Sequence, residues 1–503
     1  MSMSSQSFHD FSQRLEEFES RDAEQGEEIA RELERVRSGR KPKHTPSVKS
    51  VKEEGDEDEF LVTWDSKDSQ ENPRNWPVAK KVRIMAVVSF FSLMGPYSSS
   101  MVSPASDAIA SALETPNETE KTLLVSVFVL AYMFGPMFSS PISEAKGRRP
   151  VLLICNLIVL PMGGGSIADL FEPSQRGVAM SMYALTPLFG PSIGPVVSGW
   201  IIQGWGPDKW QWIFWTSTML SVAVEVAGFL LIPETYAPEL LRKKGQRLRK
   251  HTGNEKLHTV YDVGSETLSQ TIRRVLLRPM IFMTTELVVI LPSLYMSIIY
   301  GCFYLLIATL PMVFEFHYGM PVGISALHNL AMAAGVTAGS FTLGPLTDYT
   351  YKRLSREHGQ PQPEFKLPIL MIAVFFAPIG LLIYGWTSEY KVFWLVPDIG
   401  LFIVSAGMLG VFLQIQMYLV DVMSIYGSSA ISAAIFMRSL LGFVFPLFAH
   451  QMFNSLGFGW GCSIIALVCA VIGIPSPYLL WAYGPALRRR SKYAVKPSLQ
   501  QDK

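Results

Sequence analysis

The stretch Gly190-Pro191-Ser192-Ile193-Gly194-Pro195-Val196-Val197-Ser198-Gly199 lies inside an apolar run from about 178 to 202. Its three glycines would let a neighbouring helix approach closely, and its two prolines remove backbone donors and bend a helix. Gly190 to Gly194 also matches Gly-x-Ser-x-Gly, but a hydrolase carries that motif at a turn between a strand and a helix. We therefore interpret the run as a membrane helix that packs tightly against a neighbour.

Apolar runs of this kind recur along the 503 residues, of which 49% are hydrophobic and 17% charged. A helix needs about 20 consecutive apolar residues to cross a bilayer. Ten runs are long enough, at about 82–104, 122–143, 178–202, 210–232, 287–313, 322–346, 367–387, 393–420, 427–450 and 461–484. The sequence therefore predicts an all-α polytopic membrane protein, and the net charge of +1 gives no sign of nucleic-acid binding.

Positive charges predict which side of the membrane each loop faces, because Lys and Arg collect in loops that stay cytoplasmic. One side receives the clusters at 80–83, 146–149, 242–250, 352–356 and 488–490, and the other receives Lys121, Lys209 and Lys391. We expect both termini to be cytoplasmic, in a multi-pass protein of the plasma membrane. In the first outer loop, Asn117-Glu118-Thr119 is a sequon for N-glycosylation.

These patterns divide the chain into five parts. We expect a disordered cytoplasmic tail over 1–80, because this stretch is charged and poor in apolar residues. An N-terminal helix bundle over 81–232 and a C-terminal helix bundle over 279–485 should flank a central cytoplasmic loop over 233–278. A cytoplasmic tail over 486–503 completes the chain.

One apolar segment, 151–169, does not fit a simple crossing. The loops before and after it both have cytoplasmic character, so the segment should begin and end on the same side of the membrane. A hairpin that crosses twice needs about 40 apolar residues, whereas this segment has 19, interrupted by Pro161 and 163–165. We expect a fused, re-entrant element that lacks about one and a half helices of the third and fourth spans.

A second motif stands at the end of the second span, in Ser140-Pro141-Ile142-Ser143-Glu144-Ala145-Lys146-Gly147-Arg148-Arg149-Pro150. We interpret Glu144, Gly147, Arg148 and Arg149 as a latch that holds two helix bundles together, although plain anchoring by positive charge is the alternative. A weaker echo, Gly344 to Asp348, follows a span in the second half. Equivalent positions in two halves indicate an internal repeat, and we include Asp348 in the latch.

These motifs resemble those of the major facilitator superfamily. The loop from Glu144 to Arg149 is similar to its second-loop signature, and Gly190, Pro191, Gly194, Pro195 and Gly199 are similar to its antiporter motif. Further stretches resemble the fungal drug:proton antiporter branch, which includes polyamine and multidrug exporters: Asn72 to Trp76, Pro233 to Pro238, Pro363 to Pro368, Tyr418 to Asp421 and Arg438 to Leu440. The resemblance covers about 59–495. It implies two pseudo-symmetric six-helix bundles, with the N-terminal one incomplete.

The sequence departs from the family pattern at several positions. Ser140, Ala145 and Ser198 replace usual signature residues. More seriously, the fourth span of the family opens with an Arg-containing motif tied to proton coupling, and that region is missing between Leu160 and Gly163.

Charged residues at membrane depth are costly and usually functional. Arg438 and Glu225 are therefore our candidates for substrate or proton binding, and a position facing lipid is the alternative for Glu225. Tyr300 and Tyr304 share a helix face and could stack on a flat substrate, with packing between helices as the alternative. His328 could exchange a proton, but a structural histidine is the simpler interpretation.

We expect a proton-coupled secondary transporter that exports small organic compounds, such as drugs, toxins, polyamines or secondary metabolites, by alternating access. It would act as a monomer whose partners are the substrate, protons and the lipid bilayer. We expect no cofactor beyond the proton gradient, no metal site and no enzymatic activity, because neither a P-loop nor an HExxH pattern is present. The alternative is a transport-inactive variant, truncated by splicing or in the gene model, or a membrane sensor or scaffold.

Overall fold

The computed structural model describes residues 61–64, 69–114, 117–157, 164–171, 173–254, 257–259, 268–359, 362–423 and 426–494. Nearly all of them are helical. The first half consists of η1 (Pro73–Asn75), α2 (Val78–Ser100), η2 (Ser103–Ala105), α3 (Ser106–Ala112), α4 (Glu118–Lys146), α5 (Arg148–Leu157), α6 (Gly164–Leu170), α7 (Pro173–Trp205), η3 (Pro207–Lys209) and α8 (Gln211–Leu231).

The second half follows the amphipathic helix α9 (Ala237–Thr252). It consists of α10 (Leu268–Thr285), α11 (Leu287–Pro311), the π-helical turn η4 (Met312–His317), α12 (Val322–Leu327), α13 (Asn329–Glu357), η5 (Pro363–Lys366), α14 (Leu367–Ala373), α15 (Phe376–Glu389), α16 (Leu395–Met423), α17 (Gly427–Gly473) and α18 (Pro475–Arg490). Helix α17 reverses at Gly457, whose φ is 76°. The Glu389 carboxylate accepts hydrogen bonds from the backbone N–H groups of Phe458 and Gly459, so it caps the helix after the reversal.

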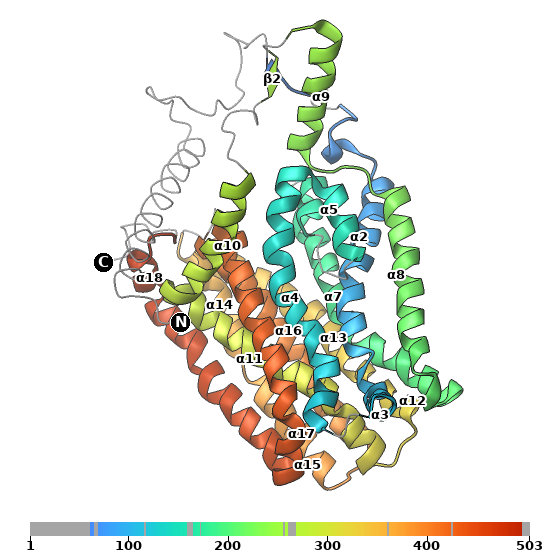
Figure 1. Cartoon of the computed structure of the whole chain (residues 1–503). Coiled ribbons are helices and arrows are strands. Elements are labelled where there is room, and N and C mark those ends of the chain that lie inside the picture. Colours follow the sequence, from blue (N-terminus) through green and yellow to red (C-terminus); the bar gives the residue numbers. More distant parts are fainter. Residues whose placement is uncertain are drawn as a thin grey trace, which may run out of the picture.

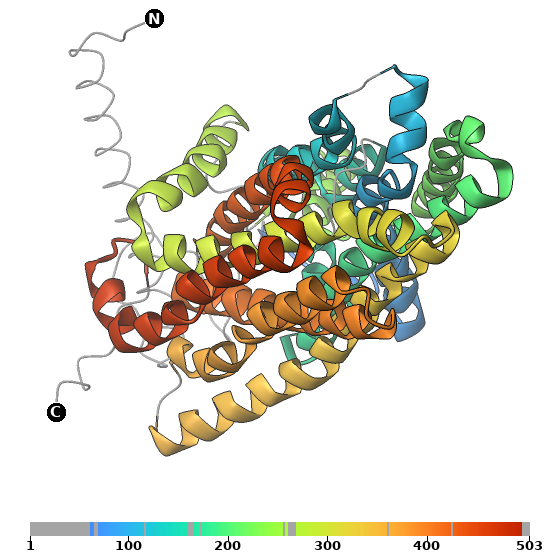
Figure 2. The same ribbon diagram turned by 90° about the horizontal axis from the view of Figure 1, so that it is seen from below.

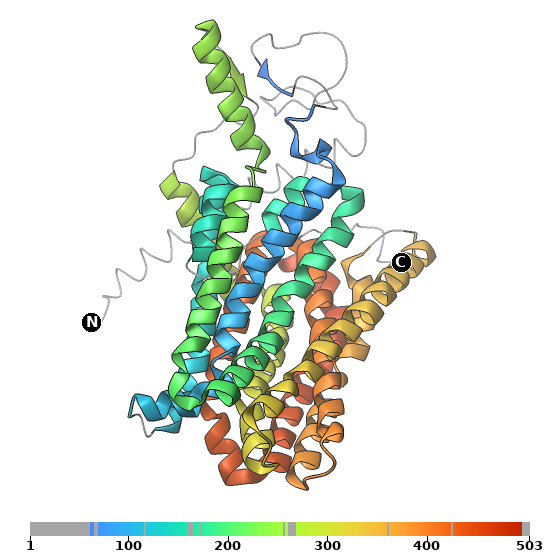
Figure 3. The ribbon, with the colours of Figure 1, turned by 90° about the vertical axis from the view of Figure 1, so that its right-hand side faces the viewer.

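The long helices form one bundle with a distinct end on each side (Figure 1). Helix α9 stands beyond one end, which we call the α9 end, and α3 and α12 lie at the other, which we call the α12 end. The first half, coloured blue to green, occupies one side of the bundle, and the second half, yellow to red, occupies the other (Figures 2 and 3).

The helical regions agree with the apolar runs, but the number of crossings stays a prediction. Seven stretches of the described chain are long and apolar enough to cross a membrane. One of them, Ser429–Arg490, has 62 residues and contains the reversal at Gly457, and α2 and α4 are not among the seven.

The structure differs from the expectation of disorder over 1–80 in the last part of that segment. The indole N–H of Trp76 donates to the carbonyl of Gln70, and the Lys81 ammonium donates to the carbonyl of Arg74. Upstream, β1 (Leu61–Val62) pairs in parallel with β2 (His258–Thr259) from the central loop, and this loop also forms α9. These two strands of two residues each are a small exception within the all-α fold.

Each half has its own hydrophobic core. The first half buries side chains around α2, including Met94 and Tyr97, and the second half buries a larger set around α11, including Tyr295 and Phe303. Helix α11 packs against α16 and α17 of its own half. It also meets the first half, because the Ser103 hydroxyl donates to the carbonyl of Ile307 over 2.8 Å.

The glycines of α7 allow close helix packing, as the sequence predicts. A Cβ at Gly190 would lie 2.8 Å from the backbone nitrogen of Tyr97 in α2, and a Cβ at Gly194 would lie 2.5 Å from the carbonyl oxygen of the same residue. Gly199 faces α12 instead, where its Cβ would be 2.5 Å from that of Ala326. Helix α7 therefore packs on α2 at Gly190 and Gly194 and on the second half at the α12 end.

We predict that Gly194→Ala destabilises the protein, whereas Gly204→Ala does not. Both glycines lie in α7, and a Cβ at Gly204 would meet no atom within 4 Å. Alanine raises helix propensity equally at both positions, so the difference in thermal unfolding of the purified proteins reports the packing. We expect Gly194→Ala to lose about 1–3 kcal/mol through overpacking. Equal melting temperatures of the two variants would contradict the close α2–α7 contact.

Candidate functional site

A group of aromatic and polar side chains lies where α11 meets the first half. Two tyrosines of α11, Tyr300 and Tyr304, have ring centroids 4.9 Å apart, which confirms that they share a face. The Tyr304 hydroxyl is 3.2 Å from the Ser99 hydroxyl of α2. The group, which we call the central aromatic cluster, comprises Ser99, Tyr132, Tyr300, Tyr304, Phe412 and Arg438 from α2, α4, α11, α16 and α17.

Arg438 is the charged member of the cluster. Its guanidinium carbon lies 4.9 Å from the ring centroid of Tyr300 and 5.3 Å from that of Phe412. Its Nε is buried and has no hydrogen-bond partner among the described residues. Among the described residues, no carboxylate forms an ion pair with Arg438. Arg438 itself is partly exposed. The guanidinium therefore has aromatic faces around it but no anionic partner among the residues that the structure describes.

Two glycines bring the ring of Tyr300 and its neighbours this close to α17. A Cβ at Gly442, one turn after Arg438, would lie 2.8 Å from the Tyr300 ring and 3.0 Å from Val129 of α4. A Cβ at Gly301 would lie 2.8 Å from the ring of Phe445. Side chains of α4, α11 and α17 therefore meet at the level of Arg438.

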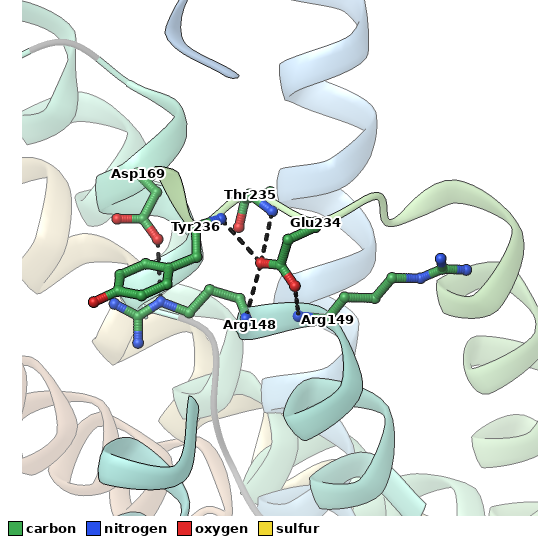
Figure 4. A network of polar contacts seen from close by, with 6 residues as sticks. All are labelled: Arg148, Arg149, Asp169, Glu234, Thr235 and Tyr236. Atoms are coloured by element: carbon green, nitrogen blue, oxygen red, sulfur yellow. Dashed lines mark hydrogen bonds and ion pairs between the residues drawn. The ribbon is translucent and has the colours of Figure 1, made fainter. Parts of the chain in front are cut away.

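A second polar network joins helix ends at the α9 end of the bundle (Figure 4). The Glu234 carboxylate accepts hydrogen bonds from the backbone N–H groups of Arg148 and Arg149 at the start of α5, over 2.9 and 3.2 Å. It also accepts from the N–H groups of Thr235 and Tyr236, which precede α9. One carboxylate thus satisfies donors at the beginning of two segments, where a helix leaves its N–H groups unpaired.

Gly147 makes this arrangement possible. Its φ of +89° is a conformation that L-residues rarely adopt, and a Cβ here would lie 2.5 Å from the Glu234 carboxylate. The tight turn between α4 and α5 therefore requires glycine, and the family signature places it there.

The side chains of the arginine pair extend the network in two directions. The Arg148 Nε donates to the Asp169 carboxylate of α6 over 3.1 Å, and its guanidinium lies 4.8 Å from the ring of Tyr236. Arg149 donates to the carbonyl of Phe229 in α8 over 2.9 Å. Burial raises the pKa of Asp169, and the charge of Arg148 opposes this shift. The contact between Arg148 and Asp169 joins the start of α5 to α6, and the re-entrant course expected for 151–169 stays a prediction.

The second half has a corresponding network that we missed in the sequence. The Glu364 carboxylate of η5 pairs with Arg488 near the end of α18 over 2.9 Å, and their side chains are 4% and 3% exposed. Beside it, Lys366 pairs with Asp421 near the end of α16 over 2.5 Å. Both acids lie in stretches that we matched to the family, so those motifs were the available signal.

The remaining candidates have different positions. Asp348, which we placed in the latch, is exposed and forms no ion pair with the described residues. The side chain of Glu144 lies outside the described part of the chain. Glu225 accepts a hydrogen bond from Asn156 of α5 over 2.6 Å and thus joins α8 to α5 rather than to the central aromatic cluster. Asn117 is exposed before α4, and its glycosylation stays a prediction.

A buried histidine–carboxylate pair lies at the α12 end. His328, between α12 and α13, has its Nδ1 2.8 and 2.9 Å from the two carboxylate oxygens of Asp398 in α16. Its ring stacks on Phe314 with centroids 3.6 Å apart. The neighbouring α12 meets α7, because the N–H of Gly323 donates to the side-chain carbonyl of Gln203 over 2.7 Å. The pair therefore adjoins a contact between the two halves.

Two helix bundles that meet around a polar, aromatic centre are the arrangement of a multi-pass membrane transporter. The sequence model of the Major Facilitator Superfamily matches residues 158–446. The chain therefore belongs to the Major Facilitator Superfamily.

Relatives and solved structures agree with this assignment. An uncharacterized transporter of Schizosaccharomyces pombe is 37% identical and is matched over 95% of its length and 87% of this chain. The efflux pump vrtL of Penicillium aethiopicum is also 37% identical, over 93% of its length and 88% of this chain. The partially occluded, inward-open structure of the Escherichia coli xylose transporter XylE has the same fold, with a TM-score of 0.55 and 15% identity over 81% of this chain and 98% of XylE.

We predict that Glu234→Ala lowers the melting temperature of the purified protein, because four backbone N–H groups lose their acceptor. The loss of a helix N-cap costs about 0.5–2 kcal/mol. Glu357→Ala is the matched control, since this exposed acid makes one ion pair, with Arg353 one turn earlier, and such pairs are worth about 0.3–0.5 kcal/mol. If both variants unfold at the same temperature, Glu234 does not hold the helix ends together.

Proposed function

We propose that the protein exports small amphipathic organic compounds in exchange for protons by alternating access. The observation that carries this proposal is the central aromatic cluster, which takes residues from both halves of the bundle. A rocking-bundle transporter binds its substrate where its two halves meet. The names of the relatives support the direction of transport, since two at 35–37% identity are called efflux pumps.

We assign the protein to the plasma membrane, with its α9 end facing the cytoplasm. The clusters of Lys and Arg at 146–149, 242–250 and 488–490 lie at this end or beyond it, and positive residues favour the cytoplasmic side. Both termini would then be cytoplasmic. The proton gradient would supply the energy for a monomer without a cofactor.

Proton exchange needs a side chain that can take up and release a proton, and the buried pair of His328 and Asp398 is our candidate. Histidine is the side chain best suited to this role. The other titratable groups beside the pair are Tyr318 and Tyr384, both near the Asp398 carboxylate. Protonation of the pair would alter the base of α12, which contacts α7 of the other half. Through this contact between α12 and α7, proton binding would change how the two halves meet at the α12 end.

A second candidate function is a transport-inactive, internally shortened form, and the two ion pairs at the α9 end favour it. Arg148 and Asp169 lie 21 residues apart in the chain. The equivalent pair of the second half, Lys366 and Asp421, lies 55 residues apart and encloses two complete helices, α14–α15 and α16. By the internal repeat, the first half lacks 34 residues between two helix ends that it retains.

The comparisons support a deletion of the same size. The match to the S. pombe transporter extends over 470 positions but includes 87% of 503 residues, or about 438, which leaves about 32 positions without a residue of this chain. The match to vrtL extends over 473 positions and includes 88%, or about 443 residues, which leaves about 30. The family model also begins to match at residue 158, inside the shortened segment and not at α2.

Export by this chain and by a repaired chimera separates the two candidates. The chimera would receive, between Leu157 and Gly164, the corresponding hairpin of vrtL. In a host without its own exporters, the first candidate predicts a several-fold lower accumulation of a fluorescent amphipathic dye with either protein. The second predicts that only the chimera lowers it, with equal surface delivery of both. If neither protein lowers it despite normal delivery, the export proposal is wrong.

We predict that His328→Gln flattens the dependence of export on external pH in the export-competent form. Glutamine keeps a polar side chain that can bond to Asp398 but cannot take up a proton, so the maximal rate should change less than the pH profile. His358→Gln, an exposed position at the opposite end of α13, is the matched control and should leave the profile unchanged. An unaltered profile in His328→Gln would exclude this pair as the site of proton exchange.

A further inference from the structure

We infer that the central aromatic cluster selects flat aromatic compounds that carry a negative charge. This inference rests on the proposed function, because it names the substrate class of the same site. It concerns binding, however, and can be tested without transport.

Arg438 brings a positive charge to the central aromatic cluster. The guanidinium of a partly buried arginine is stabilised when a counter-charge and hydrogen-bond acceptors surround it. The Nε of Arg438 is buried without an acceptor, and no described carboxylate pairs with the guanidinium. A carboxylate or sulfonate on the ligand would supply the missing acceptor and charge. Guanidinium binds such groups through two parallel hydrogen bonds.

Aromatic rings lie next to the charge of Arg438. Tyr300 and Phe412 lie on the guanidinium at 4.9 and 5.3 Å, and their ring planes are 34° apart. The Tyr132 hydroxyl is also buried and lies beside Ser99 and Tyr300 of the same cluster. A flat ring next to the anionic group would stack on these aromatic residues.

The same arrangement disfavours organic cations. Cations bind to aromatic faces in many proteins, but here Arg438 already lies against two of those faces. A second positive charge within a few ångströms would be repelled, and the low dielectric of the bundle strengthens the repulsion. The inference therefore excludes polyamines, which we included among the expected substrates, from this site.

Three probes with one ring system and different charges test the inference: 2-naphthoate, 2-naphthamide and 2-naphthylmethylammonium. Binding is measured by calorimetry on the unaltered full chain in lipid nanodiscs, so that the result does not depend on the folding of a variant. The carboxylate of 2-naphthoate would accept a charged hydrogen bond from Arg438. Such a bond raises affinity by about tenfold or more. We expect 2-naphthoate to bind at least about tenfold more tightly than the other two probes.

Variants then locate the site. Arg438→Gln should abolish the preference for 2-naphthoate, and Arg438→Lys should retain part of it because the charge remains. Arg353→Gln, at an exposed arginine near the end of α13, is the matched control and should behave like the unaltered chain. Equal affinity for the three probes, no binding of 2-naphthoate, or an unchanged preference in Arg438→Gln would each overturn the inference.

The outcome can be separated from that of the proposed function. If 2-naphthoate binds as expected but neither this chain nor the repaired chimera exports a substrate, the export proposal fails and the anion site stands. If export occurs while the probes show no preference for the anion, the reverse holds.

Discussion

Polar groups inside a membrane bundle have to find partners within the protein, because lipid supplies none. The described helices meet this constraint at their ends. Glu234, Glu364 and Asp169 each lie where two or more helices converge, and each accepts from a backbone N–H group or pairs with a basic side chain. Arg438 lies well inside α17 with aromatic neighbours, and among the described residues no acid forms an ion pair with it. The proposed anionic substrate would supply the hydrogen-bond acceptor that the Arg438 Nε lacks among the described residues.

In each half, an acid links the start of one helix to the end of the last helix of that half. In the first half, an acid at the end of α8 binds the backbone at the start of α5. In the second half, the acid Glu364 stands before α14, the counterpart of α5, and the cation Arg488 stands at the end of α18, the counterpart of α8. Each half thus has a polar contact between its third and its last helix: Glu234 binds backbone N–H groups in the first half, and Glu364 pairs with the Arg488 side chain in the second. Such a contact depends on the distance between the helix ends and on a donor that faces the acid, so either helix can carry the acid.

Much of this organisation could be predicted because it depends on local pattern. The apolar runs gave the helices, and Gly190 and Gly194 predicted a close helix contact, although not that α2 would be the partner. Loop parity predicted that Arg148 and Asp169 would lie on the same side. What failed depends on tertiary contacts: Asp348 follows a latch-like sequence but faces outward, whereas Glu364 and Arg488, 124 residues apart, meet only after folding. The order in residues 69–80 was missed because it depends on contacts such as that between Trp76 and Gln70, which hydropathy does not reveal.

If the chain is internally shortened, as the second candidate function proposes, the position of the missing residues separates binding from transport. The residues of the central aromatic cluster come from α2, α4, α11, α16 and α17, and none comes from α5 or α6. A deletion between Leu157 and Gly164 would therefore leave the ligand contacts in place. What it would remove is the length of the third and fourth spans, which a rocking first half needs as a rigid body. A chain of this kind could bind a substrate without moving it, so its loss of transport would not imply a loss of recognition.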